Sequence, residues 1–195
     1  MPASGAAAFA FVLLSLAATG QAGAAGFVAP PTLELAKVKY QLAAQQPQAL
    51  EDGRRAWTYT LDAGNETGPW TTALTVFLRP GKASSADAEF KSVSSAFKGD
   101  RAEQQRFAGH VAQHHAYWYY LTEIRREKQF AQAVAHKSFH LPACGGVLTY
   151  QFSVRYPMEW IPNDKQMAQL REAITRDNER ALAALERDRW QPDCR

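Results

Sequence analysis

The chain has 195 residues, of which 46% are hydrophobic and 21% charged, and its formal net charge at pH 7 is +3. These values are typical of a globular chain of one-domain size. Charges of both signs are interspersed, and the paired arginines at 54–55 and 125–126 stand alone. Because a phosphate backbone calls for a longer basic cluster, the composition argues against nucleic-acid binding.

The first segment of the chain resembles an export signal. Ala6–Ala18 is apolar and uncharged, and about a dozen such residues are too few to span a bilayer, which takes roughly 20. Ala22 and Ala24 follow at the A-x-A spacing of a cleavage site. We therefore predict a signal peptide over residues 1–24, with cleavage after Ala24 preferred and after Ala22 second. No Lys or Arg precedes Lys37, so the usual basic start is missing, and an apolar helix packed on the domain is the alternative.

Export would deliver residues 25–195 as a single domain to the periplasm or the medium. No later segment approaches the length of a membrane span, so no stable membrane insertion is expected after cleavage. The Ala-rich and Arg-rich composition is typical of a GC-rich bacterium. In that setting the Asn65-Glu66-Thr67 sequon is interpreted as accidental.

The first part of the exported domain predicts strands. Hydrophobic and polar residues alternate over Leu33–Leu42, which predicts one strand, and a polar stretch over Gln45–Arg55 indicates a loop. Alternation returns in Ala56–Leu61 and in Trp70–Leu78. Turn residues between these two segments, among them Gly68-Pro69, favour a hairpin.

A helix is predicted over Ser84–Lys98. A serine at 84 or 85 can cap its N terminus, and Asp87 and Glu89 lie in the first turn, where the helix dipole favours negative charge. Apolar residues at 86, 90, 93 and 97 recur at helical spacing. Gly99 ends the segment.

The second half of the chain has the strongest strand character. Three strands are predicted there, over His114–Arg126, Gln129–His140 and Val147–Tyr156. A helix is the alternative for Glu123–Ala135, where Ala, Glu, Lys and Gln dominate. Pro162-Asn163-Asp164 then begins a long amphipathic helix from about Lys165 to Arg189.

The order of these elements indicates the fold class. Strands joined by short turns, with helices held to one side, are typical of an α+β domain. We predict a single domain in which an antiparallel sheet of about five or six strands packs against two or more helices.

This order resembles the PsbP-like α+β fold over most of Leu33–Arg189. A local string adds to the likeness: Trp57-Thr58-Tyr59-Thr60-Leu61, then Asn65-Glu66, then Trp70-Thr71 with Val76 after it. It is similar to the opening hairpin of uncharacterised bacterial exported proteins, in which a Trp-Thr pair starts the second strand. The resemblance implies a binding or accessory role, because the fold is not tied to one chemistry.

Two cysteines, Cys144 and Cys194, are present. In an oxidising compartment such a pair predicts one disulfide, which would tie the C-terminal tail to the turn at Pro142–Gly146. A redox or nucleophilic role, with His140 beside Cys144, is the alternative. No C-x-x-C and no G-x-S-x-G motif supports it.

The histidines are candidate metal ligands. His110, His114, His115 and His136 form the candidate set, with His140 as a further possibility. On a helix, His110 and His114 would have the i, i+4 spacing seen in metal sites. On a strand, His110 and His114 would share one face, and His115 would point to the other. The alternative is that they are half-exposed strand histidines without a metal.

An unbroken aromatic run is the candidate binding surface. It comprises Tyr117, Trp118, Tyr119 and Tyr120. Strand geometry puts rings on both faces, so one face is expected to pack on the helices while the other could bind a protein partner or a small apolar ligand. A strand buried on both sides is the alternative.

These patterns lead to three hypotheses for the function. The first is an exported, non-enzymatic domain that binds a ligand or a protein. The second is a metal-dependent or hydrolytic enzyme that uses the histidine cluster, and the third is an immunity or inhibitor protein against an exported toxin. The chain has no Gly-rich phosphate loop and its carboxylates are scattered, and no cofactor and no catalytic residue is predicted.

Overall fold

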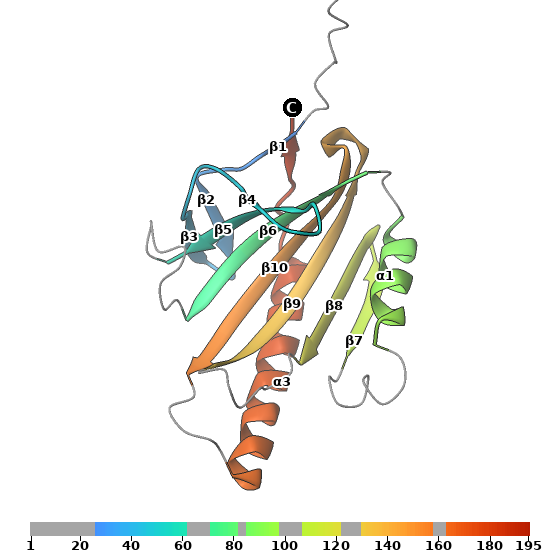
Figure 1. The fold of residues 1–195 in the computed structure, drawn as a ribbon. Coiled ribbons are helices and arrows are strands. Elements are labelled where there is room, and N and C mark those ends of the chain that lie inside the picture. The colour runs from blue at the N-terminus through green and yellow to red at the C-terminus, as the bar shows by residue number, and fades with distance from the viewer. Residues whose placement is uncertain (1–25, 62–70, 82–84, 98–106, 122–129, 158–162) are drawn as a thin grey trace, which may run out of the picture.

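The computed structural model describes residues 26–61, 71–81, 85–97, 107–121, 130–157 and 163–195 (Figure 1). The predicted signal peptide lies outside the described residues. Two α-helices are found within them, α1 (Ala86–Ser95) and α3 (Asp164–Arg187). The strands are β1 (Phe27–Val28), β2 (Thr32–Leu35), β3 (Val38–Leu42), β4 (Gln48–Ala49), β5 (Arg55–Thr60), β6 (Thr72–Pro80), β7 (Ala108–Ala112), β8 (His115–Leu121), β9 (Phe130–Leu141), β10 (Gly146–Pro157) and β11 (Asp193–Cys194).

One antiparallel sheet dominates the molecule. In the described part of the chain it has nine strands in the order β2-β3-β5-β6-β10-β9-β8-β7, and β4 pairs with β5. A separate pair, β1 with β11, joins the two ends of the domain. The α+β class and the single domain agree with the prediction, but the expected five or six strands are too few.

Two tight turns explain part of the difference between the predicted and the observed number of strands. Leu33–Leu42 is a hairpin, β2 and β3, rather than one strand, because Ala36 and Lys37 both have positive φ values, of 52° and 68°. Gln113 and His114 form an equivalent turn between β7 and β8, with φ of 50° and 66°. Neither turn has the Asn-Gly signature of a two-residue hairpin, so neither is visible in the sequence.

The other boundaries follow the sequence closely. The predicted strand over His114–Arg126 begins at His115, and its end beyond Leu121 lies outside the described residues. Residues 130–135, for which a helix was the alternative, belong to β9. The predicted loop at Gln45–Arg55 is wrong in part, because it contains the short strand β4 and its last residue begins β5.

The two helices cover opposite faces of the sheet, whereas the sequence predicted them on one side. Helix α3 packs on β8 and β9. The Tyr156 hydroxyl of β10 donates to the Asp177 carboxylate of α3, and the Lys137 ammonium of β9 donates to the Asp188 backbone oxygen after α3. Helix α1 contacts β7, β8 and β9. Its Phe97 ring meets Tyr120, which alternates along β8 with the residues on the α3 side. Both faces of β8 are aromatic, and therefore both require cover.

The main core lies on the α3 face of the sheet. Its fully buried members include Tyr59, Leu74, Leu148, Tyr150 and Leu185. A reciprocal capping box between Asn163 and Gln166 begins α3, and its buried stripe ends at Leu185. Residues of β5, β6 and β10 alternate as the sequence predicts, with aliphatic and aromatic side chains toward this core.

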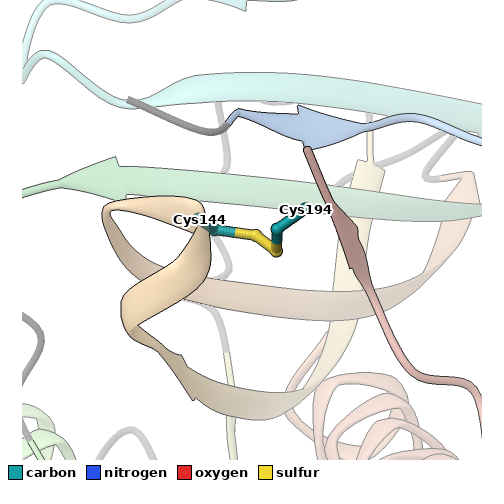
Figure 2. The surroundings of a disulfide bond; sticks show 2 residues. All are labelled: Cys144 and Cys194. Carbon is teal, nitrogen blue, oxygen red and sulfur yellow. A yellow bond between two sulfur atoms is a disulfide. The ribbon is translucent and has the colours of Figure 1, made fainter. Parts of the chain in front are cut away.

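The C-terminal tail is fastened to the sheet by a disulfide. Cys144 lies in a 3-10 turn, Pro142–Cys144, and is bonded to Cys194 in β11, with Cα atoms 5.0 Å apart (Figure 2). Between α3 and β11, Trp190 packs edge-on against Phe27 and Phe139. The predicted cysteine pairing is confirmed.

Among the described residues, neither helix combines the length and the apolar character that a membrane span requires.

Candidate functional site

The aromatic run divides between the two faces of β8. Tyr117 and Tyr119 face α3 and are buried in the main core, at 2% and 9% exposure. Trp118 and Tyr120 face α1, where Trp118 is also buried and Tyr120 is half-buried. The run is therefore not a single exposed surface, and its α1-facing half borders a cavity.

That cavity is a groove of about 280 Å³ between α1 and the sheet, here called the α1 groove. Its floor crosses four adjacent strands, β8, β9, β10 and β6. The floor side chains are Trp118, Tyr120, His136, Gln151, Thr149 and Phe77. These residues are far apart in sequence, and the strand register brings them together: Trp118 is opposite His136, and His136 is opposite Gln151.

Helix α1 forms one wall of the α1 groove. The wall residues are Glu89, Val93, Ala96 and Phe97, which share one side of the helix. Gly109 on β7 lets α1 approach closely, since a Cβ there would lie 2.8 Å from a ring carbon of Phe90 and 2.4 Å from the Tyr117 backbone oxygen. Phe90 and Phe97 both contact the Phe107 ring, which holds the helix beside β7.

His136 is the buried polar centre of the floor. Its ring stacks on Trp118 at 4.9 Å and 11°, and on Tyr120 at 5.5 Å and 16°. The ring nitrogen Nε2 lies 2.9 Å from Gln151 Oε1, and Gln151 Nε2 donates to Ser153 Oγ at 2.8 Å. Because the amide oxygen accepts, Nε2 carries the imidazole proton. Burial lowers the pKa of His136 to about 4, so the ring is neutral at pH 7.

The charged groups of the α1 groove are two arginines and one buried acid. Arg79 at the end of β6 forms an ion pair with Glu89, whose side chain is only 6% exposed. Arg54 lies over the Phe77 ring, with the guanidinium carbon 5.1 Å from the ring centroid. Its Nε also contacts Asp52 at 2.7 Å in an exposed ion pair. Within the lining of the groove, Arg54 is thus the cation that Glu89 does not neutralise, and its partner Asp52 lies outside that lining.

The candidate metal ligands are spread over both faces of the sheet. His110 faces α3, stacks on Tyr117 and lies 3.3 Å from a Glu186 carboxylate oxygen. His115 is on the same face, because the turn at residues 113–114 shifts the alternation that a continuous strand would have. The expected shared face of His110 and His114 is therefore wrong.

His136 is on the other face and is separated from His115 by the sheet. His114 is in the turn and lines a cavity of about 340 Å³ with His140 and Asp87. No group of three or more His, Cys, Asp or Glu side chains that could hold a metal ion occurs in the described part of the chain.

A larger cavity, of about 560 Å³, lies between the β2–β3 turn and the C-terminal end of α3. Charged side chains of both signs line it, including Glu34, Lys37 and Arg187. The α1 groove is the stronger candidate, because it combines stacked rings, a buried histidine network and an arginine directed over its floor.

The sequence patterns did not identify several residues of the α1 groove as site candidates, namely Arg54, Phe77, Arg79, Glu89, Thr149 and Gln151. The alternation of β10 already separates Thr149 and Gln151 from the core-facing residues. A polar face on a strand is normally solvent-exposed, however, and only the docking of α1 turns it into a floor.

No curated protein and no solved structure matches the chain. Nothing in these comparisons indicates the PsbP-like fold, which remains a prediction. The model of one uncharacterised protein family matches residues 27–190, from β1 to the tail that follows α3. This match covers most of the chain, and the protein belongs to that family.

Proposed function

We propose that this protein is exported to the periplasm or the medium and binds a small ligand in the α1 groove without transforming it. The apolar run and A-x-A site before Ala25 support export. The Cys144–Cys194 bond fits an oxidising compartment, because such bonds are rare in the reducing cytosol.

One observation carries the binding proposal: rings from three different elements line a groove on the otherwise polar face of the sheet. Phe77, Trp118 and Phe97 come from β6, β8 and the turn that follows α1. Aromatic and apolar lining with a few polar groups is the usual character of small-molecule sites. Polar handles are present in the same groove, on Thr149 and Arg54.

The internal partners of the ionisable groups favour binding over catalysis. His136 is held by Gln151 through Nε2, and the Glu89 carboxylate is held by Arg79. A general acid or base has to reach the proton that it transfers. The basic nitrogen of His136, Nδ1, is buried away from solvent, and the Glu89 carboxylate is already engaged by Arg79.

Export is tested by expressing the full chain in a bacterium and measuring the mass of the product in the periplasmic fraction. A chain that begins at Ala25 and has no free thiol is expected. Recovery of the intact chain from the cytoplasm alone would contradict the proposal.

Binding is tested with 2-naphthol, a planar aromatic probe, by NMR titration. Thr149→Phe fills the floor of the groove and is expected to weaken binding at least tenfold. The matched control is Thr58→Phe, a half-buried threonine on the same face of the sheet but in β5, outside the groove. Melting temperatures establish that both variants fold. Equal binding by the two folded variants, or no binding by the wild-type protein, would refute the groove as a ligand site.

A further inference from the structure

We propose that the α1 groove selects a planar ligand with a single negative charge, of the aromatic carboxylate or sulfonate class. This inference rests on the proposed function, and it adds the chemistry of the ligand.

The shape of the floor favours a flat ligand. Trp118 and Tyr120 stack on the His136 ring, with planes 11° and 16° from it. Trp118 and His136 are buried in this stack, so the half-buried rings of Tyr120 and Phe77 are the flat surfaces that a ligand can contact. Aromatic pairs favour offset-stacked or edge-on contact with such rings. The volume of about 280 Å³ is just below the range for pockets that hold drug-sized ligands, roughly 300–1,000 Å³, which suits a small ring system.

The charges favour an anion. Glu89 is the single acid among the described residues that line the groove, and Arg79 neutralises it. His136 contributes no charge at neutral pH. Arg54 therefore provides the charge that a ligand meets at the floor, from its place above Phe77.

The ion pair of Arg54 with Asp52 does not remove this charge from the ligand. The side chains of Arg54 and Asp52 are 41% and 53% exposed, and exposed ion pairs are worth little because solvent screens them. A planar guanidinium can bind a carboxylate or sulfonate through two parallel hydrogen bonds. An anion stacked on the floor would compete with Asp52 in a less solvated setting.

A ligand cation is disfavoured by the same arrangement. It would have to displace Arg79 from Glu89, which leaves one charge of a part-buried pair without a partner. A long alkyl chain is disfavoured by the limited volume. The remaining class is a compact aromatic anion.

The test compares 2-naphthoate, 2-naphthol and 2-naphthylmethylammonium by isothermal titration calorimetry on the exported protein. At low salt, 2-naphthoate is expected to bind at least tenfold more tightly than 2-naphthol, and the ammonium probe to bind least. Arg54→Gln is expected to bring the affinity for 2-naphthoate down to that for 2-naphthol.

The matched control is Arg55→Gln. Arg55 is the next residue, but its guanidinium lies over Trp57 on the other face of the sheet, so the preference for 2-naphthoate should persist. Equal affinity for naphthoate and naphthol in the wild-type protein, or equal effects of the two arginine variants, would overturn the proposed ligand class while leaving the groove as a binding site. Absence of binding by all three probes would overturn both proposals.

Discussion

The imidazole ring of His136 lies flat against the indole ring of Trp118, with centroids 4.9 Å apart and planes 11° apart. The two residues are direct partners in the register of β9 and β8, and α1 covers the strand beside them. This stacked pair defines the floor of the α1 groove, and its burial has consequences for stability that can be measured.

Acid should destabilise the fold through His136. Its pKa is lowered to about 4 by burial, from an ordinary value of 6.5, so the unfolded chain binds the proton first as the pH falls. Stability is therefore fully present above pH 6.5 and is lost between pH 6.5 and 4, by about 3 kcal/mol. Urea unfolding over this range should show that loss in the wild-type protein and a smaller one in His136→Phe.

The exposed His140 supplies the control for this measurement. His140→Phe should keep the slope of the wild-type protein. His115, whose pKa is also lowered by burial, contributes equally to all three proteins and cancels in the comparison. Parallel pH profiles for wild-type and His136→Phe would contradict the assignment.

The packing of α1 against the sheet should depend on Gly109. A Cβ at this position would meet the Tyr117 backbone oxygen and the Phe90 ring, so Gly109→Ala is expected to cost about 1–3 kcal/mol, as overpacking does. The same change should disturb the α1 groove and weaken probe binding. Gly26→Ala, with no atom near the added methyl group, is the control for unfolding free energy. Similar stability of the two variants would show that α1 does not pack as described.

Better turn residues should stabilise the β2–β3 hairpin. Ala36 and Lys37 both have positive φ, which costs L-residues roughly 1–2 kcal/mol each, whereas Asn-Gly suits such a turn. Ala36→Asn with Lys37→Gly is expected to raise the unfolding free energy by about 1 kcal/mol. Conversely, Gly145→Ala, at a φ of 69°, should lower it. Thermal melts of these variants decide the matter, and an unchanged or lower melting temperature for the Asn-Gly variant would count against the turn geometry.

Loss of the disulfide should be costly. The bond joins residues 50 apart, and constraint of a loop of this length in the unfolded chain is worth roughly 4 kcal/mol. Denaturant unfolding of Cys144→Ser/Cys194→Ser should show a decrease of that order. Reductant should destabilise the wild-type protein toward the same value and leave the double variant unchanged. A wild-type protein that is insensitive to reductant after denaturation would argue against the bond.

Local signals in the sequence predicted some elements well and missed others. The strict alternation of Val147–Tyr156 identified β10 within a residue at each end, because one buried and one polar face impose a period of two. The hairpin at Ala36–Lys37 was missed because its turn contains neither Gly nor Asn. The same absence hid the turn at Gln113–His114, which places His110 and His115 on one face where a continuous strand would separate them.

By itself, the sequence determined the α+β class, the long C-terminal helix and the disulfide partners, since each depends on local pattern or on counting. The export signal remains a prediction from the same kind of pattern. Only the tertiary structure decided which aromatic residues share a site. Trp118 and His136 were both noted as candidates, but for different roles, and Arg54, Glu89 and Gln151 for none. These residues are distant in the chain, and strand register and the docking of α1 bring them into one groove. A one-residue change in register would move each of the strand residues to the opposite face of the sheet.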